Sequence, residues 1–142
     1  MTTDYTDVYD LFLTKMKDWK LDYLYQTNPD NFETILHGYM VVSLPQFKNC
    51  NQSLARNDTL KKFNETLTEE NQGVIASLMV EQWLQKEIND IRQMALHLQD
   101  DFKTYSEAQN LKEKSDHWAR IKELNSQMLV DYSLDDHDLP GS

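Results

Sequence analysis

Histidines and acidic residues are the side chains of this sequence that have the chemistry to bind a metal ion. The four histidines, His37, His97, His117 and His137, are scattered, and no two have the spacing that places a pair of ligands on one helical turn. Residues 135–138 are suited to hold a cation weakly, but they lack the fixed alternation and the glycine of a calcium-binding loop. The sequence therefore predicts no metal site and no cofactor.

Residues for nucleophilic or acid–base catalysis are equally hard to find. Cys50 is the only cysteine and lies in polar sequence with no histidine close to it, and no serine occupies a glycine-rich turn. Three glycines in the whole chain are too few for a phosphate-binding loop. Carboxylates are numerous, but at this net charge they indicate a solvated surface before an acid–base pair. We predict that the protein is not an enzyme.

Size and composition indicate one helical domain. At 142 residues and 16.8 kDa, the chain is long enough to bury one core and too short for two of ordinary size. Three glycines, three prolines and a scarcity of alternating β-branched runs argue against a sandwich or barrel. Three tryptophans, seven tyrosines and five phenylalanines supply much of the surface available for burial. We therefore expect an all-α fold.

The surplus of acidic residues limits what the surface can bind. The formal charge of −10 comes from 24 acidic and 14 basic residues, so the chain should repel nucleic acid. A wall that lines a conduit for DNA would benefit from that repulsion. Residues 1–25 do not have the pattern of a secretory signal, and no apolar run is long enough for a membrane span. We expect synthesis in a reducing cytoplasm and no membrane partner.

The clearest element is an amphipathic helix over residues 68–91. Thr68 is its expected N-cap, and Glu69 and Glu70 lie in the first turn, where the helix dipole favours negative charge. Apolar residues recur along it at steps of three and four: Val74, Ile75, Leu78, Met79, Leu84, Ile88 and Ile91. This face predicts packing against another helix. The four residues proposed for the core are Trp83 and Leu84 on this helix and Phe102 and Trp118 further along the chain.

Further helices complete a small bundle of about four to five helices. The first is expected to begin near Thr6 and to end around residues 17–20, and the second to begin at Asn28-Pro29 and to be interrupted at Pro45. A polar connection over residues 49–58 follows, and Leu60 and Phe63 are expected to anchor it by packing against the core. After a packed turn near residues 100–105, the last helix should span residues 107–129. Its expected buried stripe is Leu111, Ser115, Trp118, Ile121 or Lys122, Leu124 and Met128.

The last residues predict a flexible acidic C-terminal arm, so the chain divides into a helical domain (1–130) and the arm (131–142). The arm is too polar to build a core by itself, and a free tail is the common outcome for such composition. However, Val130, Tyr132 and Leu134 alternate, as they would in a strand that adds to a neighbour. The candidate contacts with a partner are Val130, Tyr132, Leu134, Asp135 and Asp136.

Two segments and the start of the chain resemble a family of small structural proteins of tailed bacteriophages. The segments are residues 63–84 and 101–133, and the start is DYTDVYDLFLTKMKDW. The residues that carry the resemblance are packing residues: Phe63-Asn64, Leu67-Thr68, Leu78-Met79-Val80, Trp83-Leu84, Asp101-Phe102-Lys103, Tyr105-Ser106, Leu111 and Asp131-Tyr132. Members of this family are neck, or head-to-tail connector (adaptor), proteins.

The resemblance implies a location in the virion, at the neck between head and tail. A small helical subunit would assemble there as a ring of about twelve copies, through heterologous contacts that close. This ring would dock on the portal protein, complete the head and extend the DNA channel toward a further neck or tail-completion protein. Double-stranded DNA would pass through it without specific binding.

Two other classes of function stay open from the sequence. A small acidic cytoplasmic regulator would bind another protein, acting as a mimic of DNA charge, and would be a monomer or dimer with carboxylates spaced along one exposed face. A helical-bundle enzyme with a buried carboxylate site would need a Glu-x-x-His pair, and no such pair occurs. The connector is the interpretation that the resemblance favours, and the composition of the chain is compatible with it.

Overall fold

The structure, a computed structural model, describes a helical bundle at residues 2–16, 26–97 and 101–137, with side chains at 2–16, 26–90 and 111–134. In chain order its elements are helix α1 (Tyr5–Lys15), helix α3 (Pro29–Ser43), the short 3₁₀ helix η1 (Leu44–Gln46), strands β1 (Arg56–Asn57) and β2 (Lys62–Phe63), helix α4 (Glu69–His97) and helix α5 (Asp101–His137). The predicted all-α class is confirmed.

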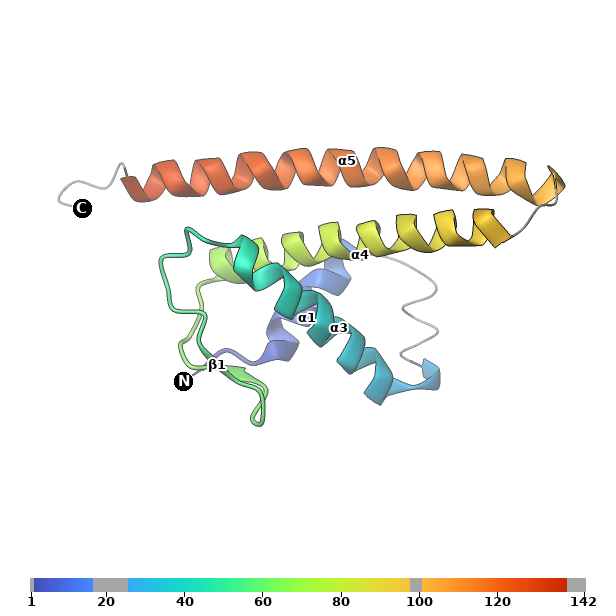
Figure 1. The fold of residues 1–142 in the computed structure, drawn as a ribbon. Helices are drawn as coiled ribbons and strands as arrows, with labels where there is room; N and C mark the ends of the chain where they lie inside the picture. Colours follow the sequence, from blue (N-terminus) through green and yellow to red (C-terminus); the bar gives the residue numbers. More distant parts are fainter. Residues whose placement is uncertain (1, 17–25, 98–100, 138–142) are drawn as a thin grey trace.

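Helix α4 is the centre of the fold (Figure 1). Helix α5 runs back along one side of it, and α1 and α3 pack against α4 from the other side. The consecutive residues Val74, Ile75 and Ala76 are all buried. Since successive residues of a helix point about 100° apart, α4 must be covered on more than one side to bury all three. The amphipathic face predicted for this helix is therefore only part of what it buries.

Both long helices extend beyond the predicted bounds. Thr68 caps α4 as expected, because its Oγ1 accepts a hydrogen bond from the backbone N–H of Asn71 (3.1 Å). The helix then continues to His97, and α5 already begins at Asp101, where a packed turn was predicted. No glycine or proline occurs between residues 74 and 139, so nothing in the sequence stops either helix early.

The shorter helices begin and end at residues that explain their bounds. Asp4, not Thr6, is the N-cap of α1, and its backbone N–H donates to Asp7 Oδ2 (3.1 Å). Asn28 caps α3 as predicted, because its Oδ1 accepts from the N–H of Asn31 (3.2 Å) and Pro29 follows at the first helical position. Helix α3 ends at Ser43, two residues before Pro45.

A small antiparallel hairpin lies where the sequence predicted only a polar connection. Arg56 pairs with Phe63 and Asn57 with Lys62, and Asp4 adds a single bridge to Lys62. Phe63 is fully buried and pins the hairpin to the core as predicted, whereas Leu60 is 63% exposed and does not. The strands are two residues each and mostly polar, which leaves no alternating pattern to recognise.

Candidate functional site

The residues predicted to contact a partner lie in the last turns of α5, not in an extended arm. Helix α5 continues to His137, so the strand-like arm predicted from residue 131 is wrong as far as residue 137; residues 138–142 lie outside the described residues. Val130 and Leu134 are four residues apart and share one helical face, while Tyr132 points to the opposite face. A helix thus explains the alternation that was interpreted as a strand.

The helix separates the predicted contact residues into two groups. Tyr132 is 4% exposed and belongs to the core, whereas Val130 and Leu134 are each 52% exposed on the side of α5 away from α4. Asp135 and Asp136 continue the helical backbone, and their side chains lie outside the described residues. Of the three described side chains, only Val130 and Leu134 are therefore free to meet a partner. We call this pair the α5 tip.

Tyr132 closes a polar network that fixes the end of α5 to the start of α4. Its hydroxyl donates to Asn71 Oδ1 (2.7 Å) and accepts from the backbone N–H of Asn51 (2.9 Å). The amide of Asn71 donates in turn to Asn51 Oδ1 (3.0 Å) and to Gln52 Oε1 (2.7 Å). The edge of the Phe47 ring meets the Tyr132 ring, with centroids 5.0 Å apart. Because Asn71 is fully buried, this network specifies one register of α5 on α4.

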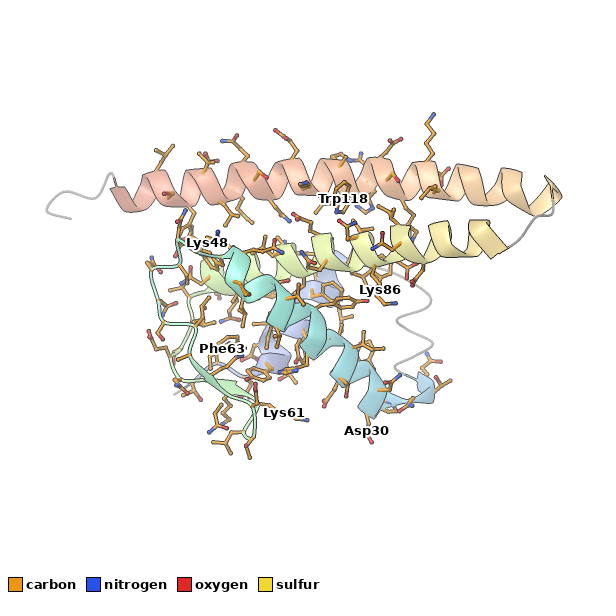
Figure 2. All side chains as sticks on the ribbon, viewed as in Figure 1. Asp30, Lys48, Lys61, Phe63, Lys86 and Trp118 are labelled. Carbon is orange, nitrogen blue, oxygen red and sulfur yellow. The ribbon has the colours of Figure 1, made fainter. Side chains whose placement is uncertain are left out.

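The residues predicted for core packing are largely where the sequence placed them. Trp83 and Leu84 are buried, and Trp118 is half-buried between α5 and α4 (Figure 2). Two lysines cover these rings: Lys114 Nζ lies 4.7 Å from the Trp83 ring centroid and Lys122 Nζ lies 4.9 Å from that of Trp118. The side chain of the fourth core candidate, Phe102, lies outside the described side chains.

An apolar groove runs beside the contact between α4 and α5, and the sequence analysis missed it. Its lining residues are Lys15, Ser77, Val80, His117, Ile121, Leu124, Asn125 and Met128, and its volume is about 240 Å³. Leu124 was predicted to be buried, yet it is 59% exposed at this groove. Asn125 is buried in its place, because its amide donates to the Ser77 carbonyl (2.9 Å) and to Glu81 Oε1 (3.1 Å). We call this feature the α4–α5 groove.

A second cluster of polar groups joins the hairpin to α1 and α3. The hydroxyl of Tyr5 donates to Asp58 Oδ1 (2.5 Å), and His37 Nε2 lies 3.3 Å from the same oxygen. Lys61 Nζ pairs with Glu33 Oε2 (3.1 Å) at the rim of the adjoining pocket, whose volume is about 180 Å³. These residues are far apart in sequence and carry no common spacing, so sequence reasoning did not connect them.

The electrostatics of Tyr5 and Asp58 suit a structural contact between these two groups. Burial and the bond to Asp58 raise the pKa of Tyr5 to about 12, so the phenol keeps its proton. The hydrogen bonds from Tyr5 and His37 lower the pKa of Asp58, so its carboxylate stays charged. A general acid or base needs a pKa near the working pH, and both groups are moved away from it. The cluster therefore holds the hairpin in place.

The described part of the chain contains no group of three or more metal-ligating side chains. None of the helices within that part is both long enough and apolar enough to cross a lipid bilayer. The α5 tip and the α4–α5 groove are the candidate surfaces for function, because both present apolar side chains to solvent.

Comparison with known proteins found no matching protein-family model, no matching curated protein and no matching solved structure. The function must therefore be inferred from the chain's own residues and their geometry.

Proposed function

We propose that this protein is a subunit of a head-to-tail connector ring in the virion of a tailed double-stranded DNA bacteriophage. The ring would dock on the portal protein and extend the DNA channel toward the tail. One observation carries the proposal: α5 has 37 residues, which corresponds to about 55 Å, and α4 is its main helical partner, along one side only. The other side is a long surface that other subunits can cover.

The apolar residues on α5 support assembly. Leu124, Val130 and Leu134 are large aliphatic side chains of α5, and each is more than half exposed. Single exposed aliphatic residues are common on protein surfaces, but three on one helix, of which Leu124 also lines the α4–α5 groove, favour a protein–protein contact. A ring gives each subunit two such contacts, one with each neighbour.

The distribution of polar interactions supports a structural role. The buried amides of Asn71 and Asn125 fix α4 against its neighbours, and the Tyr5–Asp58 bond fixes the hairpin. A rigid subunit with a specified helix register is what a symmetric assembly requires, because each interface is repeated in every copy.

The net charge supports a channel for DNA. With 24 acidic and 14 basic residues, the chain offers phosphates more repulsion than attraction, so DNA would pass without being retained. The resemblance to phage neck proteins adds to this argument, because it includes the segments that form most of α4 and α5.

The mass of the isolated protein in solution tests the proposal. Size-exclusion chromatography with light scattering should give a large closed oligomer of about twelve subunits, either for the protein alone or after addition of the portal protein encoded by the same genome. A monomer or dimer that does not bind the portal protein would contradict the connector role. If it binds another protein instead, the alternative function as a small acidic regulatory protein would be favoured.

A further inference from the structure

The C-terminal end of α5 carries charges that its own helix disfavours. Asp135 and Asp136 lie in the last turn of α5, and no lysine or arginine occurs from residue 123 to residue 142. A helix C-terminus is the negative end of the helix dipole, so carboxylates are destabilising there. Asp131 is exposed next to the α5 tip, where it accepts a hydrogen bond from Gln127 Nε2 (2.9 Å). An apolar pair flanked by carboxylates favours a partner surface that is both apolar and positively charged.

The α4–α5 groove has that complementary character. Lys15 is one of its lining residues, and the exposed side chain of Leu124 is another. His117 also lines the groove, and its pKa is lowered by burial and by the positive charges of Arg120 and Lys114. Lys15 lines the groove, and Lys114 and Arg120 add positive charge beside His117. The Glu81 carboxylate, which accepts a hydrogen bond from Asn125, offsets part of this charge.

The dimensions of the groove fit side chains better than a cofactor. Its volume of about 240 Å³ is below the ~300–1,000 Å³ of typical small-molecule sites. Its apolar walls come from Val80, Ile121, Leu124 and Met128. A space of this size and lining suits one or two aliphatic side chains from a neighbouring helix.

We propose that the α5 tip of one copy docks in the α4–α5 groove of the next copy, with Val130 and Leu134 against the apolar walls and the acidic end of α5 toward Lys15. This inference rests on the proposed connector function and names the surfaces through which the copies meet. A chain cannot fill its own groove with its own tip, because residues 121–128 and 130–134 belong to the same continuous helix. The occupant must come from another molecule.

In a ring this contact is heterologous, because each copy gives its tip to one neighbour and receives a tip from the other. Each copy offers one tip and one groove, so in this arrangement each copy has two neighbours. The series of contacts forms a ring when the rotation between copies closes, and an open filament when it does not. An isologous dimer, in which each tip enters the groove of the other copy, would use the same two surfaces and stop at two copies, so wild-type dimers that grow no further would refute the ring.

Two single-surface variants and their mixture test this contact. The tip variant is Val130→Ser with Leu134→Ser, and the groove variant is Leu124→Glu, which places a carboxylate where the acidic tip would dock. Leu60→Glu is the matched control, because Leu60 is similarly exposed but lies in the turn between β1 and β2. All substituted residues are more than half exposed, and circular dichroism should confirm that the helical content is unchanged. Sedimentation or light scattering over a concentration series then measures association.

The wild type and the control should form higher oligomers, and each surface variant should associate at least about tenfold more weakly. A 1:1 mixture of the two variants should form dimers and nothing larger, since the intact tip of one variant and the intact groove of the other make a single good contact.

Rings that still form in both variants would refute the contact but would be compatible with the connector function. Wild-type filaments that both variants abolish would support the contact and refute the connector. Absence of any dimer in the mixture would overturn the contact, and binding of the portal protein would then decide the function separately.

Discussion

Substitution of Tyr132 by phenylalanine tests whether the end of α5 belongs to the subunit's own fold. The change removes the hydroxyl that donates to Asn71 Oδ1 and accepts from the N–H of Asn51. It keeps the aromatic ring, so the edge contact with Phe47 is retained. The experiment therefore isolates the polar network from apolar burial.

The expected loss follows from the burial of Asn71. This residue is 1% exposed, so its Oδ1 cannot find water after the hydroxyl is removed, and a buried unsatisfied acceptor costs about 1–3 kcal/mol. The backbone N–H of Asn51, an exposed residue, can turn to solvent and adds little. We predict that Tyr132→Phe lowers the free energy of unfolding by about 1–3 kcal/mol.

Urea unfolding followed by circular dichroism measures this loss, with Leu134→Ala as the control. Leu134 lies two residues away on the exposed face, so its substitution should change stability by no more than about 0.5 kcal/mol. A double-mutant cycle with Asn71→Ala should give a coupling of at least about 0.5 kcal/mol. A loss for Tyr132→Phe below about 0.5 kcal/mol, with no coupling to Asn71, would show that the polar network does not fix the end of α5. The prediction of a detached arm would then stand.

Three further predictions concern the core, the binding of DNA and the buried tyrosine Tyr5. Trp83→Ala should cost about 3–5 kcal/mol of unfolding free energy, and a loss under about 1 kcal/mol in a urea melt would show that the core lies elsewhere. The isolated protein should not retain duplex DNA in a gel-shift assay at about 0.15 M salt, and tight binding would count against the channel. Tyr5 has a pKa raised to about 12, so the folded state holds its proton more tightly than the unfolded state does. Its stabilising contribution is complete below the unfolded pKa of 10.0 and is lost as the pH rises toward about 12. Tyr5→Phe should make alkaline unfolding depend less steeply on pH over this range, and an unchanged pH dependence would contradict the assignment.

The helices were predictable because their signals are local. Thr68 and Asn28 cap α4 and α3 where hydroxyl or amide oxygens precede a helical pattern, and Pro45 lies just past the end of α3. The buried face of α4 follows from the spacing of its apolar residues. These starts depend on neighbouring residues, so the sequence alone was sufficient to predict them, although it did not predict where α4 ends or where α5 begins.

The errors come from contacts between residues far apart in the chain. Leu124 was placed in the core because it is apolar, but Asn125 takes that place, since its amide satisfies groups of α4 that lie 44 and 48 residues earlier. Tyr132 was assigned to an arm because its neighbours are acidic, but its partner Asn71 lies 61 residues away. The α4–α5 groove could not be predicted from the sequence either, because three segments that are separate in the chain line it.

Electron microscopy of the protein mixed with the portal protein of the same genome tests the connector proposal most directly. We predict a second ring coaxial with the portal ring, built from copies of this chain, with an open channel that continues through both. Portal rings that remain bare while this chain stays monomeric in the same sample would contradict it.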